Sequence, residues 1–375
     1  MNYLLYSIFL LLGFGQIQRL SFFNGTISLS LYEILMFLFI LIFFAKKKGV
    51  NRNIDVLYKE AVIFLTVLAV SLIWQFWLFT LWDNIIGVSY LLRLLIYFFF
   101  ALAIFSYTSE KNGYFGVKKS LELLSVVTII FSYGQYFFYP NIRNLFYLGW
   151  DPHVSRAVGL FFDSATAGAI FGLLALYQLT VFKKNHLVRN LLLFIALVVL
   201  LLLSYSRASY LAFGAGFLYY SKYYLRPLAV LAIFFIFLSA ILLLPKSEGQ
   251  STNLKRFFSI EARIESINQG LMLWKKNLLL GVGYNRIGAF AEKKEIPNHA
   301  SASFQSSYVT ILATSGIIGL SCLFLLMLAL FNNVNHLGKI VISFIAILSL
   351  FDNILFQNFV LLTIIFLCSL SLSRK

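Results

Sequence analysis

The chain has 375 residues, of which 61% are hydrophobic and 12% are charged, and its mean hydropathy is +0.87. A soluble domain cannot bury that much apolar surface, so the composition excludes a soluble protein and predicts a polytopic integral membrane protein. The net charge of +16 would favour nucleic acid as the partner of a soluble protein. Here most Lys and Arg residues flank apolar runs, so we expect them to set the orientation and to contact lipid headgroups, with no nucleic acid as partner.

About twelve apolar segments are long enough to cross a bilayer, which predicts an all-α membrane domain that takes in the whole chain, residues 1–375. The predicted spans are 3–20, 28–45, 60–80, 84–107, 120–138, 158–181, 187–204, 206–223, 226–244, 304–331, 338–353 and 354–372. The first segment lacks a preceding positive region and a small-residue cleavage site, so we expect a span and not a signal peptide. Cys322 and Cys368 lie inside apolar runs and are expected to pack as small apolar side chains.

Lys and Arg residues concentrate in alternate connections between these spans. If both termini are cytoplasmic, the cytoplasmic connections and tail carry Lys46, Lys47, Lys48, Arg52, Lys59, Lys111, Lys118, Lys119, Lys183, Lys184, Arg189, Lys222, Arg226, Lys339, Arg374 and Lys375. The opposite short connections and helix ends carry only Arg19, Arg143, Arg156 and Arg207. Because positive residues favour the cytoplasmic side, residues 245–303 are predicted to form one large extracytoplasmic loop.

The segment 254–320 is the part of the chain that differs most from a plain bundle of membrane helices. Its apolar residues recur in steps of three and four at Phe257, Ile260, Ile264, Ile267, Leu271, Trp274 and Leu278. This period predicts an amphipathic helix that can lie in the membrane surface. The Gly-rich residues 281–286 are expected to end that helix. Gly316 and Gly319, in the following span, are small enough for close helix packing. We interpret the loop as a lid over an active site.

Several arginines are predicted to meet on one face of the membrane, whichever way the chain is inserted. Arg207 begins the eighth span and the large loop with Arg263 follows the ninth, so both lie on the same side. By the same parity, the connection 139–157 shares that side, and it contributes Asp151, His153 and Arg156. This shared face is the candidate site.

An arginine at membrane depth is costly unless it pairs or meets a ligand. Its planar guanidinium group also matches phosphate oxygens in pairs, so Arg207 and Arg263 are predicted to bind a phosphate at the interface. For Arg207 the alternative is snorkelling to the headgroups, and for Arg263 it is an ion pair with Glu261 or Glu265. Arg156, Arg256 and Arg286 are further candidates for substrate binding.

Arg93 lies in the middle of the fourth span and is expected to pair with Gln75 or Glu122, in a structural role. Tyr284, Tyr308 and Trp274 are candidates for stacking on sugar rings.

His299 is, with His153, a histidine that the predicted topology places near the arginines. A neutral imidazole suits a general base, so His299 is the predicted catalytic base, with Asp163, Glu261 and Glu265 as alternatives. The chain has no Walker A pattern, no Asp-x-Asp, no His-Glu-x-x-His and no closely spaced His/Cys set. We therefore expect neither a metal nor a cofactor.

The order of these features resembles the O-antigen polymerase and O-antigen ligase family of bacterial envelope glycosyltransferases. The resemblance rests on Ser206 and Arg207 at the start of a span, and on a large outer loop with Arg263 and Trp274. It continues in Leu-Leu-Gly-Val-Gly-Tyr-Asn at 279–285 and in the run 306–320. It implies transfer of a glycan from an undecaprenyl-pyrophosphate carrier to an acceptor hydroxyl, without metal or nucleotide. Arg207 and Arg263 would then hold the pyrophosphate leaving group.

One position departs from the family pattern. Ligases of the family carry a histidine about eleven residues before the glycine that matches Gly316, and here Gln305 stands at that position. His299 lies six residues earlier and is expected to act as the base in its place. The departure favours the polymerase branch, with Gln305 as a substrate-binding residue.

The resemblance implies an enzyme that polymerises undecaprenyl-pyrophosphate-linked repeat units of O-antigen, capsule or exopolysaccharide on the outer face of the bacterial inner membrane. Both termini are expected in the cytoplasm. The donor and acceptor would be lipid-linked oligosaccharides, and membrane lipids, a flippase and a chain-length regulator are further expected partners. The alternatives are ligation of a finished glycan to a lipid A-core or other acceptor, and flipping of lipid-linked sugars. A flippase would be expected to show paired, interrupted helices in two related halves.

Overall fold

A computed structural model describes residues 1–23, 26–46, 55–245, 258–290 and 303–372. Twelve helices overlap the twelve predicted spans: α1 Asn2–Gly13, α2 Leu31–Lys46, α3 Asp55–Trp74, α4 Leu81–Thr108, α5 Lys111–Phe138, α6 Ser164–Asn185, α7 Val188–Leu203, α8 Arg207–Tyr224, α9 Pro227–Leu242, α11 Ser307–Asn333, α12 His336–Phe351 and α13 Asn358–Leu372. Within the described residues, five of these helices (α3, α4, α5, α6 and α11) are long and apolar enough to cross a membrane by length and composition alone. The protein is thus a multi-pass membrane protein, and the count of twelve spans stays a prediction.

The second half of the first predicted span is wrong. After α1 the chain forms a 3-10 turn, Gly15–Gln18, and then two antiparallel strands, β1 Arg19–Phe22 and β2 Ile27–Ser30. The helix stops because α1 meets the turn Gly159–Phe161: Gly15 has a φ of 53°, and a Cβ there would lie 2.3 Å from the Leu160 carbonyl oxygen. Among the described residues the class is therefore all-α apart from this one hairpin.

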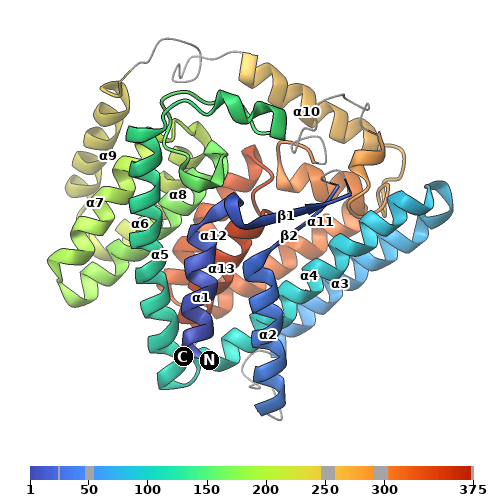
Figure 1. Cartoon of the computed structure of the whole chain (residues 1–375), viewed down its shortest axis with the longest axis horizontal. Helices are drawn as coiled ribbons and strands as arrows, with labels where there is room; N and C mark the ends of the chain where they lie inside the picture. The colour runs from blue at the N-terminus through green and yellow to red at the C-terminus, as the bar shows by residue number, and fades with distance from the viewer. Residues whose placement is uncertain (24–25, 47–54, 246–257, 291–302, 373–375) are drawn as a thin grey trace.

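The helices form one bundle around α6, which contacts α7, α8, α12 and α13. α9 lies at the edge of the bundle, and none of its residues is buried. The two termini lie at one end, and α10 (Phe258–Trp274) crosses the opposite end (Figure 1). Near the termini, the Tyr107 hydroxyl donates to the side-chain oxygen of Asn2 at 2.8 Å, and Thr108 donates to the Ser369 carbonyl at 3.1 Å. Both ends of the chain therefore meet the same end of α4.

α11 is broken at Gly316, whose φ of 64° and ψ of −168° are not helical. The segment 278–283 runs beside the break. Its backbone pairs with that of α11 through Val282 N–H to Ala313 O (2.9 Å), Gly283 N–H to Thr314 O (2.9 Å) and Ile317 N–H to Leu278 O (3.0 Å). Irregular backbone inside a membrane bundle needs such partners within the protein. The Gly-rich residues thus pair with the broken part of α11 and do not end α10. That helix ends earlier than predicted, at Trp274.

A buried ion pair joins α2 to α4. Arg93 donates from Nε and Nη2 to the two carboxylate oxygens of Glu33, at 2.7 and 2.8 Å. The Tyr97 hydroxyl and the Ser30 N–H, each at 2.8 Å, also donate to this carboxylate, so the pair is tied to β2 as well. The sequence-based choice of Gln75 or Glu122 as partner of Arg93 is therefore wrong. Both have other contacts, because Gln75 donates to the Gly281 carbonyl at 3.4 Å and Glu122 pairs with Arg189 at 2.9 Å.

The break in α11 gives the first prediction. A Cβ at residue 316 would lie 2.1 Å from the Leu279 carbonyl oxygen, in a backbone conformation that L-residues rarely adopt. Gly316→Ala is therefore expected to destabilise the purified protein by about 1–3 kcal/mol, measured as a lower thermal unfolding midpoint in detergent. Gly214→Ala is the control, since nothing lies within 4 Å of the added methyl group. Equal midpoints for the two variants would contradict the close approach.

The ion pair gives the second prediction. Glu33→Ala leaves the guanidinium group of Arg93 buried without its carboxylate, so folding stability should fall by about 3–5 kcal/mol. The double variant Glu33→Gln/Arg93→Met removes both charges and should be closer to wild type, as judged by folded yield and unfolding midpoint. A double variant that is less stable than Glu33→Ala would show that the lone charge is not the cause.

Candidate active site

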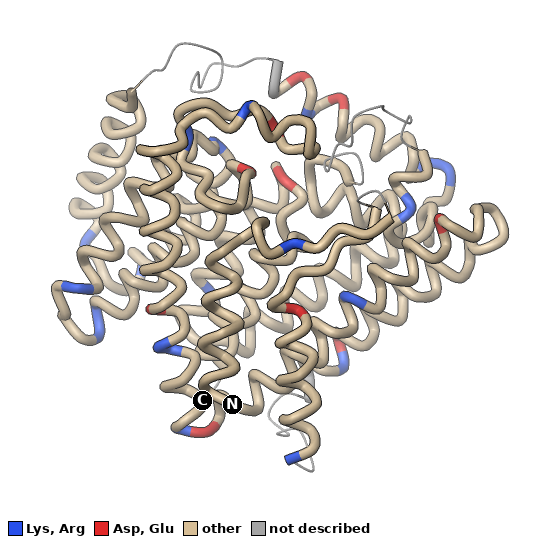
Figure 2. The backbone as a smooth tube through the Cα atoms, in the orientation of Figure 1, with Lys and Arg blue, Asp and Glu red and all other residues tan. Residues whose placement is uncertain are grey.

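A cavity of about 1030 Å³ lies at the end of the bundle that α10 covers. This volume is at the upper end of the usual range for ligand sites, roughly 300–1,000 Å³. Its lining residues come from 16–30, 82–97, 149–166, 262–289, 303–305 and 352–361. Each of these segments lies at a connection that follows an odd-numbered predicted span, or at an adjoining helix end. Figure 2 shows both basic and acidic residue positions inside this end of the bundle.

Five of the predicted site residues line this cavity: Arg156, Arg263, Tyr284, Arg286 and Gln305. Arg207, at the N-terminus of α8, is absent from the described residues that line the cavity, but it lies close enough to Arg263 for the two positive charges to interact. The connection that carries Arg156 is held against the end of α7 by a hydrogen bond from the Ala157 N–H to the Leu203 carbonyl at 2.9 Å. The parity argument thus brings these arginines to one end of the bundle.

Three further predicted site residues are not among the described residues that line the cavity. Tyr308 does not line it, and its hydroxyl donates to the Ala346 carbonyl at 3.0 Å between α11 and α12. Substrate binding by Tyr308 stays a prediction. His299 and Arg256 lie outside the described residues.

Arg263 reaches from α10 to the connection between α12 and α13. Its Nη2 lies 3.3 and 3.4 Å from the carboxylate oxygens of Asp352, and the two side chains are 27% and 14% exposed. The alternative pairing with Glu261 or Glu265 is wrong, since both lie on the exposed face of α10.

Asp352 has the properties of a proton acceptor. Burial raises the pKa of its carboxyl group to about 7; the charge of Arg263 acts against this rise and that of Asp163 adds to it. A carboxyl group with a pKa near 7 takes up and releases a proton at neutral pH. Its backbone is fixed, because the Ser307 hydroxyl donates to its carbonyl oxygen at 3.2 Å. Sequence reasoning missed this residue. Counting the spans, which puts Arg207 on the face of the candidate site, also puts the α12–α13 connection on that face.

Asp163, an alternative base from the sequence, also lines the cavity but caps α6. Its carboxylate accepts the Thr166 N–H at 2.8 Å and the Thr166 hydroxyl at 2.6 Å. An N-cap carboxylate that accepts these hydrogen bonds is held in place by the helix that it caps. Asp163 therefore has a structural role at the start of α6.

Arg286 is only 1% exposed and stacks on Phe79, with the guanidinium carbon 4.6 Å from the ring centre. Its Nη2 donates to the side-chain oxygen of Asn84, while Nε and Nη1 have no hydrogen-bond partner in the part of the chain that the structure describes. Buried donors without a partner are costly. Since Arg286 lines the cavity, these two groups are suited to a ligand oxygen.

Aromatic residues add apolar walls to the cavity. Tyr284 lines it as expected, whereas Trp274 is absent from the described lining residues and donates its indole N–H to the Leu278 carbonyl at 3.0 Å. Trp82 and Trp150 line the cavity and were missed. Arg19 of β1 lies over the Trp150 ring at 5.6 Å, so the hairpin contributes one more arginine to the wall.

Comparison with known proteins gives a match to a protein family. Residues 191–324 match the model of a family described as O-antigen ligase. This segment contains Arg207, Arg263, the glycine residues that pair with α11, and Gln305. No curated protein matches the chain. The resemblance seen in the sequence is thus confirmed over residues 191–324, which match the O-antigen ligase family.

Proposed function

We propose that this protein is a glycosyltransferase that polymerises undecaprenyl-pyrophosphate-linked repeat units on the outer face of the bacterial inner membrane. The observation that carries the proposal is the contact between Arg263 and Asp352 inside a cavity rich in arginine. This contact places a cation, which can stabilise the leaving phosphate, beside a carboxyl group whose pKa is raised to about 7. These are the two functions that glycosyl transfer from a pyrophosphate requires.

The reaction assigns each group a task. The acceptor hydroxyl of one lipid-linked unit attacks the anomeric carbon of the growing chain on its carrier. The bond between that carbon and the phosphate oxygen breaks, and the pyrophosphate leaves with the electron pair. Arg207 and Arg263 stabilise the negative charge on the leaving group, because fixed cations in a site with little water act strongly there. Asp352 accepts the hydroxyl proton, and Arg156 and Arg286 bind further substrate oxygens.

Gln305 supports polymerisation over ligation. It lines the same cavity as Arg263, and its backbone N–H donates to the Ser266 hydroxyl at 3.0 Å. The family's ligases have a histidine at this position, whereas a glutamine amide cannot accept a proton at neutral pH. Ligation remains the second candidate, because the matching family is described as O-antigen ligase. The two reactions differ only in the acceptor.

We assign the large loop, residues 245–303, the role of a cover over the site. The predicted apolar stripe is open to the surroundings: Ile260 and Ile264 of α10 are 41% and 54% exposed, and Leu278, beyond the end of α10, is 52% exposed. Such a stripe fits the interface of a lipid leaflet. A helix anchored there holds Arg263 above the cavity, at the depth where the phosphates of a carrier lipid lie. A flippase and a chain-length regulator are the proposed protein partners.

The flippase alternative has one observation in its favour, the break in α11 at Gly316. Broken helices in transporters occur in pairs from two related halves. The break in α11 has a different use, since it provides the backbone partners of segment 278–283. Polymer formed by the purified protein in liposomes from lipid-linked units on one side only would support transfer and exclude a need for flipping.

The third prediction concerns Asp352. Because its carboxyl group must be deprotonated to accept a proton, the initial rate of polymerisation should rise with pH as pH passes about 7. Asp352→Asn should lose this rise and fall in rate by about 100-fold or more, measured with purified protein and lipid-linked units in liposomes.

Asp83→Asn is the matched control, since Asp83 lines the same cavity and its carboxylate accepts a hydrogen bond from Thr80 at 2.5 Å. It should keep the wild-type pH profile. If Asp352→Asn keeps that profile and His299→Ala loses it, the proton acceptor is His299 instead.

The fourth prediction concerns the arginines. Lysine keeps the positive charge but lacks the planar pair of donors, so Arg207→Lys or Arg263→Lys should lower the rate by about tenfold or more. Polymer length and yield are measured in cells at matched protein levels. Arg189→Lys is the control, because Arg189 pairs with Glu122 away from the cavity. Wild-type polymer from both site variants would favour snorkelling, which lysine supports equally well.

A further inference from the structure

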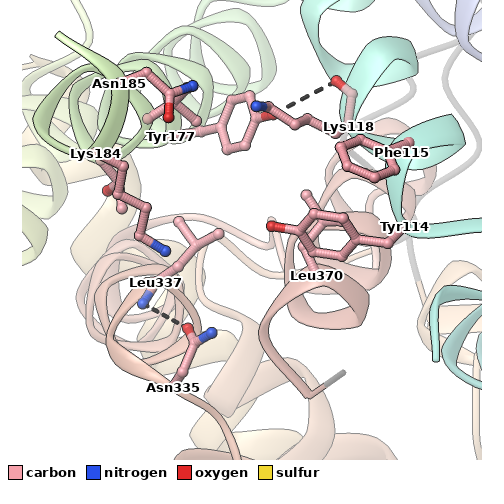
Figure 3. Close-up of a pocket in the computed structure, with 11 residues that line it drawn as sticks. Tyr114, Phe115, Lys118, Tyr177, Lys184, Asn185, Asn335, Leu337 and Leu370 are labelled. Atoms are coloured by element: carbon pink, nitrogen blue, oxygen red, sulfur yellow. Dashed lines mark hydrogen bonds between the residues drawn. The ribbon is translucent and has the colours of Figure 1, made fainter. Parts of the chain in front are cut away.

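A second cavity, of about 250 Å³, lies at the end of the bundle opposite α10, and Figure 3 shows its lining residues. Its lining comes from the start of α5, the end of α6, the start of α12 and the end of α13. The first three of these helix ends adjoin connections that follow even-numbered predicted spans. The fourth is the end of the last predicted span. α6 separates the two cavities: Thr166 lines the first and Thr180 the second, about 21 Å apart along the helix axis.

The charged residues among the described lining residues of this second cavity are both lysines. Lys118 of α5 and Lys184 of α6 both line it, and Figure 3 shows their side chains on two walls. None of the described lining residues is acidic. Glu122, whose charge acts on Tyr177 in the wall, is paired with Arg189 at 2.9 Å.

Neutral donors and apolar groups complete the lining. The α12 N-terminus opens here, where Asn335 caps the helix by accepting the Leu337 N–H at 2.9 Å. The positive end of the helix dipole thus adds to the lysines. Phe115, Val181 and Leu370 form the apolar part of the wall. A pocket with two ammonium groups and apolar sides suits a ligand with a phosphate attached to a hydrocarbon portion.

We propose that this cavity binds the phosphodiester headgroup of an anionic membrane lipid from the leaflet at the end that carries the termini. Basic pockets between membrane helices take such headgroups on the side where Lys and Arg concentrate. The cavity is too small for a whole lipid, so the acyl chains would lie along the bundle surface. The site is independent of glycosyl transfer and shares no lining residue with the first cavity.

The test compares two double variants with the same change of charge. Lys118→Gln/Lys184→Gln removes the lysines that line the cavity, whereas Lys119→Gln/Lys183→Gln removes their chain neighbours, which do not line it. Purified protein in detergent is titrated with phosphatidylglycerol or phosphatidylcholine, and the thermal unfolding midpoint is recorded at physiological ionic strength. A ligand that binds only the folded state raises this midpoint.

We expect phosphatidylglycerol, but not phosphatidylcholine, to stabilise the wild type and the control variant. For Lys118→Gln/Lys184→Gln the half-saturating concentration should rise about thirtyfold, since each lysine contributes about fivefold to headgroup binding. Equal responses of the two double variants would overturn the site. Equal stabilisation by inorganic phosphate would overturn the lipid as ligand and assign a soluble phosphate. If the double variant does not fold, each single variant should show about a fivefold shift, and no shift in either would overturn the proposal.

Discussion

The contact between Arg263 and Asp352 is the interaction on which the proposed site depends, because it joins the covering helix α10 to the connection between α12 and α13. Each group compensates the charge of the other in a place where a lone charge would be costly. In the reaction proposed above, the pairing also couples substrate binding to proton transfer. A pyrophosphate that draws Arg263 toward itself weakens the influence that lowers the pKa of Asp352 and adds negative charge nearby. The carboxylate then becomes a stronger base when the donor is bound.

Close backbone contacts at glycine residues support the site. Segment 278–283 and the broken turn at Gly316 pair backbone to backbone, which requires that no side chain stand between them. The same segment leads directly into Tyr284 and Arg286, so both enter the cavity from a rigid support. The two stretches 279–285 and 306–320, which contributed to the resemblance to the family, are thus one structural unit. Their small residues let the two backbones approach closely, and this matters more than flexibility.

Hydropathy and charge parity are enough to predict most of this fold. The positions of the apolar helices, except for the second half of the first segment, and the presence of Arg156 and Arg263 in one cavity follow from them, since both depend on local sequence and on counting. The hairpin 19–30 was missed because a short apolar run fits a helix or a strand equally well until Gly15 meets Leu160. The partners of Arg93 and Arg263 were missed for another reason. Glu33 and Asp352 are distant in sequence, and only the packing of helices decides which carboxylate an arginine reaches.

The two ends of the bundle use two kinds of cation. Arg19, Arg93, Arg156, Arg263 and Arg286 line the first cavity, whereas Lys118 and Lys184 line the second. Arginine presents a planar set of donors and keeps its charge when desolvated, which suits a pyrophosphate that must be held in one orientation while a bond breaks. Lysine is a flexible, strongly hydrated point charge, which suits a headgroup that only needs to be retained. Because α6 and α13 contribute to both cavities, a lipid bound at the lysines would steady the helices that position Asp163 and the wall of the arginine cavity.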